Sequence, residues 1–254
     1  MNESLLAAYD RTRRWIPDPI PAGLTYELDG PLLRVSGLYR GFVEGPPVLD
    51  PEGLDELIAR QCAYFGARGE AFEWKTRGHD RPADLPDRLT RAGFVPEPAE
   101  TVLIGVAEEL RAEPPLPEDV TLRQVTADHD LRAIAEMESV VWGEDWSWLA
   151  DDLIRRVADG STEVLVAESG GRVVSAAWLV HKPGTRFAGL WGGSTLKEFR
   201  GRGVYRALVA HRARLAVASG VDYLQVDASE DSRPILQRLG FEAVTTTTPY
   251  VWQP

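Results

Sequence analysis

From residue 120 onward, hydrophobic residues alternate between the spacing of strands and the spacing of helices. Segment 120–126 (VTLRQVT) is typical of a strand. Segment 128–143 carries apolar residues at helical spacing, and Asp128 stands where a capping residue would begin that helix. A second helix is expected over 145–160, closed by Gly160. The pattern therefore opens as a strand followed by two helices.

Glycine pairs mark the strands that come next. The strands are expected over 163–169, 172–181 and 187–196. Gly170-Gly171 is a strong hairpin signal between the first two. Gly192-Gly193 lies inside the third strand and predicts a bulge or a close approach of another backbone.

The remaining pattern completes a mixed sheet flanked by helices. It predicts a helix over 203–219, a strand over 222–228, a short helix over 233–240 and further strands near the C-terminus. This order favours an α/β fold with an α+β mixed sheet.

A charged, proline-containing stretch over 107–120 is typical of a linker and divides the chain into domains 1–112 and 118–254. The first half echoes the second, because RLTRAGF (88–94) matches ILQRLGF (235–241) at Leu, Arg, Gly and Phe. AFEWKTRGHD precedes the first copy much as DYLQVDASED precedes the second. The echo indicates a duplicated domain.

Composition narrows the class of protein. A formal charge of −11 argues against nucleic-acid partners and anionic membrane surfaces. A single cysteine leaves no intrachain disulfide, and four scattered histidines predict no metal site. No apolar run reaches membrane-spanning length, and the N-terminal residues lack the order of a signal peptide, so we expect a cytoplasmic protein.

The segment EFRGRGVYRALV (198–209) is the clearest candidate for chemistry. Gly201 and Gly203 permit a tight turn between a strand and a helix. The first amides of a helix have no intrahelical partner, so this turn can bind an anion such as a pyrophosphate. Arg200, Arg202 and Arg206 add positive charge. The alternative is a plain turn with solvated arginines.

Other phosphate and nucleic-acid motifs do not fit this segment. The lysine and hydroxyl residue of a P-loop are missing, and Leu208 stands where a dinucleotide fingerprint needs its third glycine. RNA-binding arginine–glycine segments are repetitive, whereas this one occurs once between periodic elements.

The segment resembles the acetyl-CoA signature of the GNAT superfamily of N-acetyltransferases, Arg/Gln-x-x-Gly-x-Gly/Ala, as Arg200-x-x-Gly203-x-Tyr205. The element order over 120–254 and the segment SEDSRPILQRLGF are also similar to that family. The first half is similar only through the echo and lacks a counterpart to RGRG. The resemblance thus implies two tandem GNAT-like acyl-CoA N-acyltransferase domains, the first degenerate.

The resemblance implies a set of residues that bind acetyl-CoA as co-substrate. Backbone amides of the turn would hold the pyrophosphate, the end of the 187–196 strand would pair with the pantetheine arm, and the bulge would separate this strand from the next. The residues are Ser194, Thr195, Leu196, Arg200, Gly201, Arg202, Gly203, Val204, Tyr205, Arg206, Ser229 and Ser232.

Two positions depart from the family pattern. Tyr205 stands where Gly or Ala is expected, which a backbone cradle tolerates if the ring points away. Leu236 stands where many members carry a tyrosine that protonates the departing thiolate, and Tyr250 is a possible substitute. Asp227 and Glu230 are the first candidates for the general base, with Glu144 and His181 as others.

Between the first two helices, WGEDWSWL places three tryptophans beside two acidic residues. Trp142, Trp146 and Glu144 would suit a cationic amine through cation–π contact and charge attraction. The alternative is that the tryptophans pack between helices. The expected partner is a small-molecule or peptide amine, with a homodimer possible.

The favoured function is an acetyl-CoA-dependent N-acetyltransferase in which the amine attacks the thioester directly. A second hypothesis is a non-catalytic acetyl-CoA-binding protein with a regulatory or structural role. A third keeps the enzyme and takes the amine of a thiol-sugar metabolite as acceptor, as in tandem relatives that make mycothiol.

Overall fold

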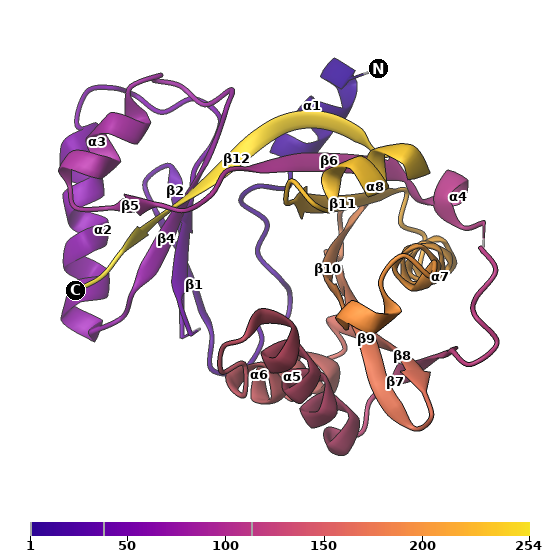
Figure 1. The fold of residues 1–254 in the computed structure, drawn as a ribbon. Coiled ribbons are helices and arrows are strands. Elements are labelled where there is room, and N and C mark those ends of the chain that lie inside the picture. Colours follow the sequence, from indigo (N-terminus) through magenta and orange to yellow (C-terminus); the bar gives the residue numbers. More distant parts are fainter. Residues whose placement is uncertain (1, 38, 113) are drawn as a thin grey trace. The chain divides into compact units, whose positions relative to one another are not determined.

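The computed structural model describes residues 2–37, 39–112 and 114–254 (Figure 1). They form two compact units. Unit 1 comprises Met1–Leu103, Asp227–Gln237 and Glu242–Pro254, and unit 2 comprises Ile104–Val226 and Arg238–Phe241. These units are not successive stretches of chain, so the predicted domains 1–112 and 118–254 remain a sequence-based prediction.

The elements of unit 2 follow the predicted order. They are α4 (Ala107–Leu110), β7 (Thr121–Val125), α5 (Asp128–Trp142), α6 (Trp148–Ala158), β8 (Thr162–Ser169), β9 (Arg172–His181), β10 (Phe187–Thr195), the 3-10 turn η1 (Lys197–Phe199), α7 (Val204–Ala218) and β11 (Tyr223–Ala228). The predicted capping role of Asp128 is wrong: Ala127 holds the N-cap position, and no side chain caps α5. Part of the predicted linker is the short helix α4.

The strands of unit 2 form a mixed sheet in the order β11-β10-β9-β8-β7. Strands β7 to β10 are antiparallel neighbours, and β10 pairs with β11 in parallel. Gly170 and Gly171 both have positive φ, 57° and 78°, in the turn between β8 and β9. The predicted hairpin is therefore confirmed, with the backbone conformation that favours glycine.

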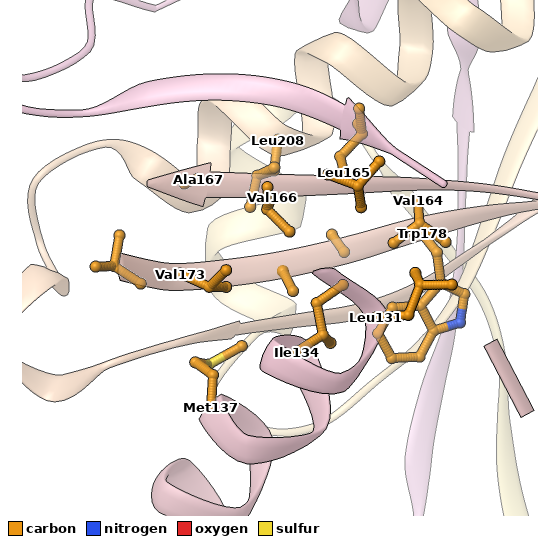
Figure 2. Packing of buried hydrophobic residues seen from close by; sticks show 14 of the residues in the cluster. Leu131, Ile134, Met137, Val164, Leu165, Val166, Ala167, Val173, Trp178 and Leu208 are labelled. Atoms are coloured by element: carbon orange, nitrogen blue, oxygen red, sulfur yellow. The ribbon is translucent and has the colours of Figure 1, made fainter. Parts of the chain in front are cut away.

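Helices cover both faces of this sheet. Consecutive residues Val164 to Ala167 of β8 are all at most 1% exposed, which requires packing on both sides because successive side chains alternate between faces. Figure 2 shows Ile134 of α5 and Leu208 of α7 on opposite sides of the strands. The sheet of unit 2 is thus the middle layer between α5 and α7.

Strands β10 and β11 are paired over only part of their length. Their parallel register ends at Gly189 opposite Gln225, although β10 continues to Thr195. A bulge follows on β10, where Gly193 is the extra residue between Gly192 and Ser194 in the register with β9. The predicted bulge is therefore confirmed, and the two strands separate just before it.

Unit 1 contains a second group of strands and helices. They are α1 (Asn2–Asp10), β1 (Thr25–Asp29), β2 (Leu32–Ser36), β3 (Gly41–Glu44), α2 (Leu54–Arg68), β4 (Phe72–Arg77), α3 (Leu85–Arg91), β5 (Val95–Pro96), β6 (Glu100–Val106), which continues into unit 2, and β12 (Glu242–Trp252). The short helix α8 (Arg233–Leu239) precedes β12. Among the described residues, β12 is one long strand where the sequence predicted several.

The C-terminal strand completes the sheet of unit 1. The order is β1-β2-β3-β4-β12, and β12 pairs with β4 in antiparallel register from Thr247–Arg77 to Trp252–Phe72. Phe65 and Phe72 stack with ring centroids 4.2 Å apart in the core beneath it. Residues from the two ends of the chain therefore build one sheet.

The packing of unit 2 yields a stability prediction. Leu165 is fully buried in the sheet, so Leu165→Ala should lower the free energy of unfolding by about 2–5 kcal/mol, through lost burial and the cavity left behind. Val140→Ala is the control, because Val140 on α5 is 66% exposed and its loss should change stability by less than about 0.5 kcal/mol. Urea denaturation measures both, and equal effects would contradict the assigned core.

Candidate functional site

The start of α7 leaves backbone amides available. Gly203 occupies the N-cap with φ 87°, and no side chain caps the helix. The first helical hydrogen bond runs from the Ala207 amide to the Gly203 carbonyl at 3.0 Å. The amides of Val204, Tyr205 and Arg206 come before this bond, so the helix provides no acceptor for them. This arrangement can bind an anion.

The three arginines of this turn have different partners. Arg200 Nε donates to the Thr195 carbonyl at 2.8 Å and so ties the turn to the end of β10. Arg202 pairs with Asp119 at 2.5 Å. Arg206 forms no ion pair with any residue in the described part of the chain. Of these three arginines, Arg206 is therefore the one whose positive charge no carboxylate or carbonyl of the described residues engages.

Tyr205 packs on the bulge of β10. A Cβ at Gly193 would lie 2.6 Å from the Tyr205 ring, and Gly193 has φ 94°. The ring therefore turns toward β10, a neighbour that the sequence analysis did not identify. Burial raises the pKa of the Tyr205 phenol. A glycine on β10 makes room for the large side chain that replaces the small residue expected on α7.

Arg212 lies seven residues after Tyr205 on α7. It is a buried cation that the sequence analysis missed. It is 1% exposed, and its Nη1 donates to the carbonyls of Trp191 at 3.1 Å and Trp178 at 3.4 Å. Burial lowers the pKa of its guanidinium to about 10. An arginine on the apolar face of a helix was the available signal, since Arg212 lies seven residues after Tyr205.

The predicted pantetheine-binding strand lies directly after the bulge. Ser175 Oγ donates to the Ser194 carbonyl at 2.6 Å and lies 2.8 Å from Thr195 Oγ1. The Leu196 amide donates to the Val174 carbonyl at 2.9 Å. These bonds fix the conformation of the segment, and its pairing with a pantetheine arm stays a prediction.

Glu138 on α5 is a second buried charged group that the sequence analysis missed. It is 2% exposed, and Trp142 Nε1 donates to its Oε2 at 2.9 Å. Burial raises the pKa of its carboxyl, while the nearby Ser194 and Trp142 side chains act in the opposite direction. A glutamate at a position between apolar residues of α5 was the only sign in the sequence.

The tryptophans between α5 and α6 form a row. Trp142 and Trp146 stack at 6.0 Å, and Trp146 and Trp148 lie at 5.4 Å. Trp146 packs against the core of unit 2, whereas Trp142 is 59% exposed and Glu144 is exposed. Trp146 thus has a packing role, whereas Trp142 and Trp148 are exposed. Contact of this row with an acceptor stays a prediction.

Other predicted site residues belong to unit 1. Asp227 pairs with Lys75 at 2.5 Å. Burial acts to lower the pKa of Lys75, but the charges of Asp227 and Glu73 outweigh it and raise that pKa. Glu230 is exposed. The hydroxyls of Ser229 and Ser232 lie 3.2 Å apart in the turn before α8.

Two residues considered for the general acid are also in unit 1. Tyr250 is the candidate, and Leu236 stands at the position where the family pattern places a tyrosine. Tyr250 on β12 is opposite Trp74 in the register and packs against the unit 1 core. Burial raises the pKa of its phenol, and so does the charge of Asp87. Leu236 is fully buried in α8. The catalytic roles of Asp227, Glu230 and Tyr250 stay predictions.

The described residues contain neither a candidate metal site nor a candidate membrane-spanning helix. No group of three or more His, Cys, Asp or Glu side chains there is placed to hold a metal ion. None of the helices in that part of the chain combines the length and the apolar character needed to span a bilayer.

Comparison with known proteins agrees with this geometry. Residues 129–241 match the family model of the Acetyltransferase (GNAT) family. A search of curated protein sequences finds no match. Residues 129–241 are therefore similar to the acetyltransferase domains of the GNAT family, which carry out acyl-CoA-dependent acetyl transfer.

Solved structures extend the similarity of fold over nearly the whole chain. A GCN5-related N-acetyltransferase from Kribbella flavida has a TM-score of 0.71 at 16% identity, covering 99% of this chain and 95% of that one. A tandem GNAT protein from the clavulanic acid biosynthesis pathway has a TM-score of 0.64 at 15% identity, covering 92% of this chain and 84% of that one. A GCN5-related N-acetyltransferase from Sphaerobacter thermophilus has a TM-score of 0.62 at 16% identity, covering 89% and 82%. At these identities, the likeness concerns the fold.

The contact between Gly193 and Tyr205 can be tested with a double-mutant cycle. Gly193→Ala should lower the free energy of unfolding by about 1–3 kcal/mol through overpacking, with an added cost from its positive φ. In a Tyr205→Ala background the overpacking cost should disappear, so urea denaturation should give an interaction energy of about 0.5–3 kcal/mol.

Gly184→Ala is the matched control for that cycle. Gly184 has φ 78°, and nothing lies within 4 Å of an added Cβ, so the substitution should have only the backbone cost. Its effect should be the same with Tyr205 present or absent. An additive cycle at Gly193 would contradict the assigned contact.

Proposed function

We propose that unit 2 binds acetyl-CoA and transfers its acetyl group to an amine by direct attack on the thioester. The observation that carries the proposal is the position of the free amides of α7 beside a bulged β10 that has separated from β11. An anion site and an open strand edge thus lie next to each other in one unit, within the family-matched segment 129–241.

The roles divide along the chain from β10 to α7. The amides of Val204 to Arg206, with Arg206 beside them, bind the pyrophosphate of acetyl-CoA. The backbone of β10 beyond Gly189 has lost its parallel partner and pairs with the extended pantetheine arm. The thioester then lies at the bulge, where Gly193 leaves no side chain in the way.

The reaction requires alignment and proton transfer. The amine must lose a proton before it attacks the thioester carbon, and the thiolate that leaves is a fair leaving group because a thiol titrates near ~8.5. Asp227 and Glu230 remain candidates for the base, and Tyr250 for the acid. Holding both substrates in one site supplies much of the rate enhancement of such a transfer.

We also propose that the chain is a tandem protein whose first copy binds no acetyl-CoA. The helix–glycine–phenylalanine echo has the same local structure twice: Gly93 and Gly240 have φ 93° and 108°, and Phe94 and Phe241 are 2% and 3% exposed. Each pair follows a short helix, α3 or α8. The same turn therefore buries a phenylalanine in both halves.

The counterpart of the anion site in the first copy has the wrong charge. Helix α2 also begins at a glycine with positive φ, Gly53 at 74°. The residues around this start are acidic and exposed, namely Asp50, Glu52, Asp55 and Glu56. Asp55 pairs with Arg88 at 3.2 Å, and the other three carboxylates would repel a pyrophosphate, whereas arginines surround the start of α7.

A non-catalytic acetyl-CoA-binding protein is the second candidate function. The buried Leu236 at the position of the usual acid favours it, as does the ion pair that engages Asp227. This alternative shares the binding site and differs only in turnover. For the enzyme, we propose a small-molecule or peptide amine as acceptor, lying against the exposed ring of Trp142 near Glu144.

Calorimetry with acetyl-CoA tests the binding site. The wild type should bind one equivalent, and Gly203→Pro should weaken binding by a factor of about ten or more, because proline cannot adopt φ 87°. Gly220→Pro is the matched control, since Gly220 at the other end of α7 has φ 73° and lies far from the free amides. It should leave the affinity within about twofold.

The other outcomes separate the hypotheses. No binding by the wild type would contradict the proposed function, and two equivalents would contradict the silent first copy. Release of the CoA thiol is then followed with a panel of small amines, amino acids and peptides. Acetyl-CoA that binds and is never consumed would favour the non-catalytic alternative.

A further inference from the structure

Glu138 keeps one carboxylate oxygen buried without a partner. Its Oε2 accepts from Trp142 Nε1, but its Oε1 has no hydrogen-bond partner among the described residues. The side chain is 2% exposed on α5. A buried carboxylate with a free oxygen destabilises the fold unless something offsets its lost hydration. A glutamate in this position therefore requires an explanation beyond packing.

Among the residues that the structure describes, no cation compensates the charge of Glu138. Helix α5 packs against α6, β9 and β10. Within the described part of the chain, none of these elements places a charged group near the carboxyl, and Glu138 forms no ion pair with any lysine, arginine or histidine there. The polar groups that act on it are the Ser194 hydroxyl of β10 and the Trp142 indole of its own helix. The Glu138 carboxylate can therefore bind a cationic group or accept a proton.

Ser194 connects this carboxylate with the bulge. The missing Cβ of Gly193 faces Tyr205 on α7, whereas the hydroxyl of the next residue, Ser194, acts on Glu138 of α5, which packs against β10. Ser194 is half-buried, and its hydroxyl lies near Glu138 without completing a hydrogen bond to Oε1. It therefore lies between the strand edge assigned to the thioester and the buried carboxylate.

We propose that Glu138 is the proton acceptor for the acceptor amine, reached through the Ser194 hydroxyl. This inference rests on the proposed acetyl transfer. The ammonium form of the acceptor gives a proton to Ser194 Oγ while the Ser194 hydroxyl proton passes to Glu138 Oε1. The neutral amine then forms the C–N bond, the C–S bond breaks, and the second amine proton leaves with the thiolate as the free thiol.

The position of Glu138 defines the class of acceptor. An amine that is protonated at neutral pH supplies the positive partner that Glu138 lacks among the described residues. It also supplies the proton that the Glu138 carboxylate takes up. Such an acceptor is an alkylamine or a peptide amino terminus. Burial also raises the pKa of Glu138 toward neutral pH, which suits a general base. Because the base acts as carboxylate, the rate should fall as the pH drops through this raised pKa.

The test compares two substitutions on one helix, using the best amine of the panel. Glu138→Gln should lower kcat by about 10²–10⁴-fold and remove the acid limb of the pH–rate profile. Acetyl-CoA affinity should be unchanged, and the melting temperature should equal or exceed that of the wild type, because the amide carries no buried charge. Glu136→Gln, exposed on the same helix, should leave all four properties as in the wild type. Ser194→Ala should also lower kcat, and the double variant should be no slower than the slower single one.

The remaining outcomes distinguish a wrong role for Glu138 from a failure of the proposed acetyl transfer itself. If Glu138→Gln keeps the wild-type kcat and acid limb, the inference is wrong while acetyl transfer stands. If Trp142→Phe, which removes the indole N–H together with part of the ring, loses as much activity and Glu138→Gln keeps the acid limb, Glu138 merely positions the tryptophan and the inference is wrong. If the wild type binds acetyl-CoA but acetylates no amine, both the inference and the transfer fail.

Discussion

The bulge of β10 is the constraint on which the rest of the site in unit 2 depends. One extra residue, Gly193, leaves the ladder with β9 just after the pairing with β11 has ended. It makes room for the Tyr205 ring of α7, and the next residue, Ser194, acts on Glu138 of α5. Arg212 binds the Trp191 and Trp178 carbonyls beside the bulge, so the irregular backbone keeps its hydrogen bonds inside the protein.

Two buried charges lie on opposite faces of this strand. Arg212 comes from α7, on the side assigned to acetyl-CoA, and Glu138 comes from α5, on the side assigned to the amine. Neither forms an ion pair within the described residues, and burial shifts the pKa of each toward its neutral form. Such groups reduce stability, and they are typical of sites whose ligands carry the opposite charge.

The two halves of the chain place the same helix start in different charge environments. Both α2 and α7 begin at a glycine with positive φ, but carboxylates surround the first and arginines the second. The backbone supplies the amides in both cases, so the charge of nearby side chains decides whether an anion binds. Unit 1 instead uses its charged residues in internal pairs such as Arg13–Asp80 and Lys75–Asp227.

The sequence by itself determined the elements of unit 2, the bulge and the glycine turn before α7, because hydrophobic period and glycine placement act over a few residues. It also indicated the echo at Gly93 and Gly240. It did not reveal that β12 joins the sheet of unit 1, nor that Tyr205 turns toward Gly193. Glu138 and Arg212 escaped notice for the same reason: burial and missing partners are properties of side chains brought together from distant elements, and only the tertiary structure decides them.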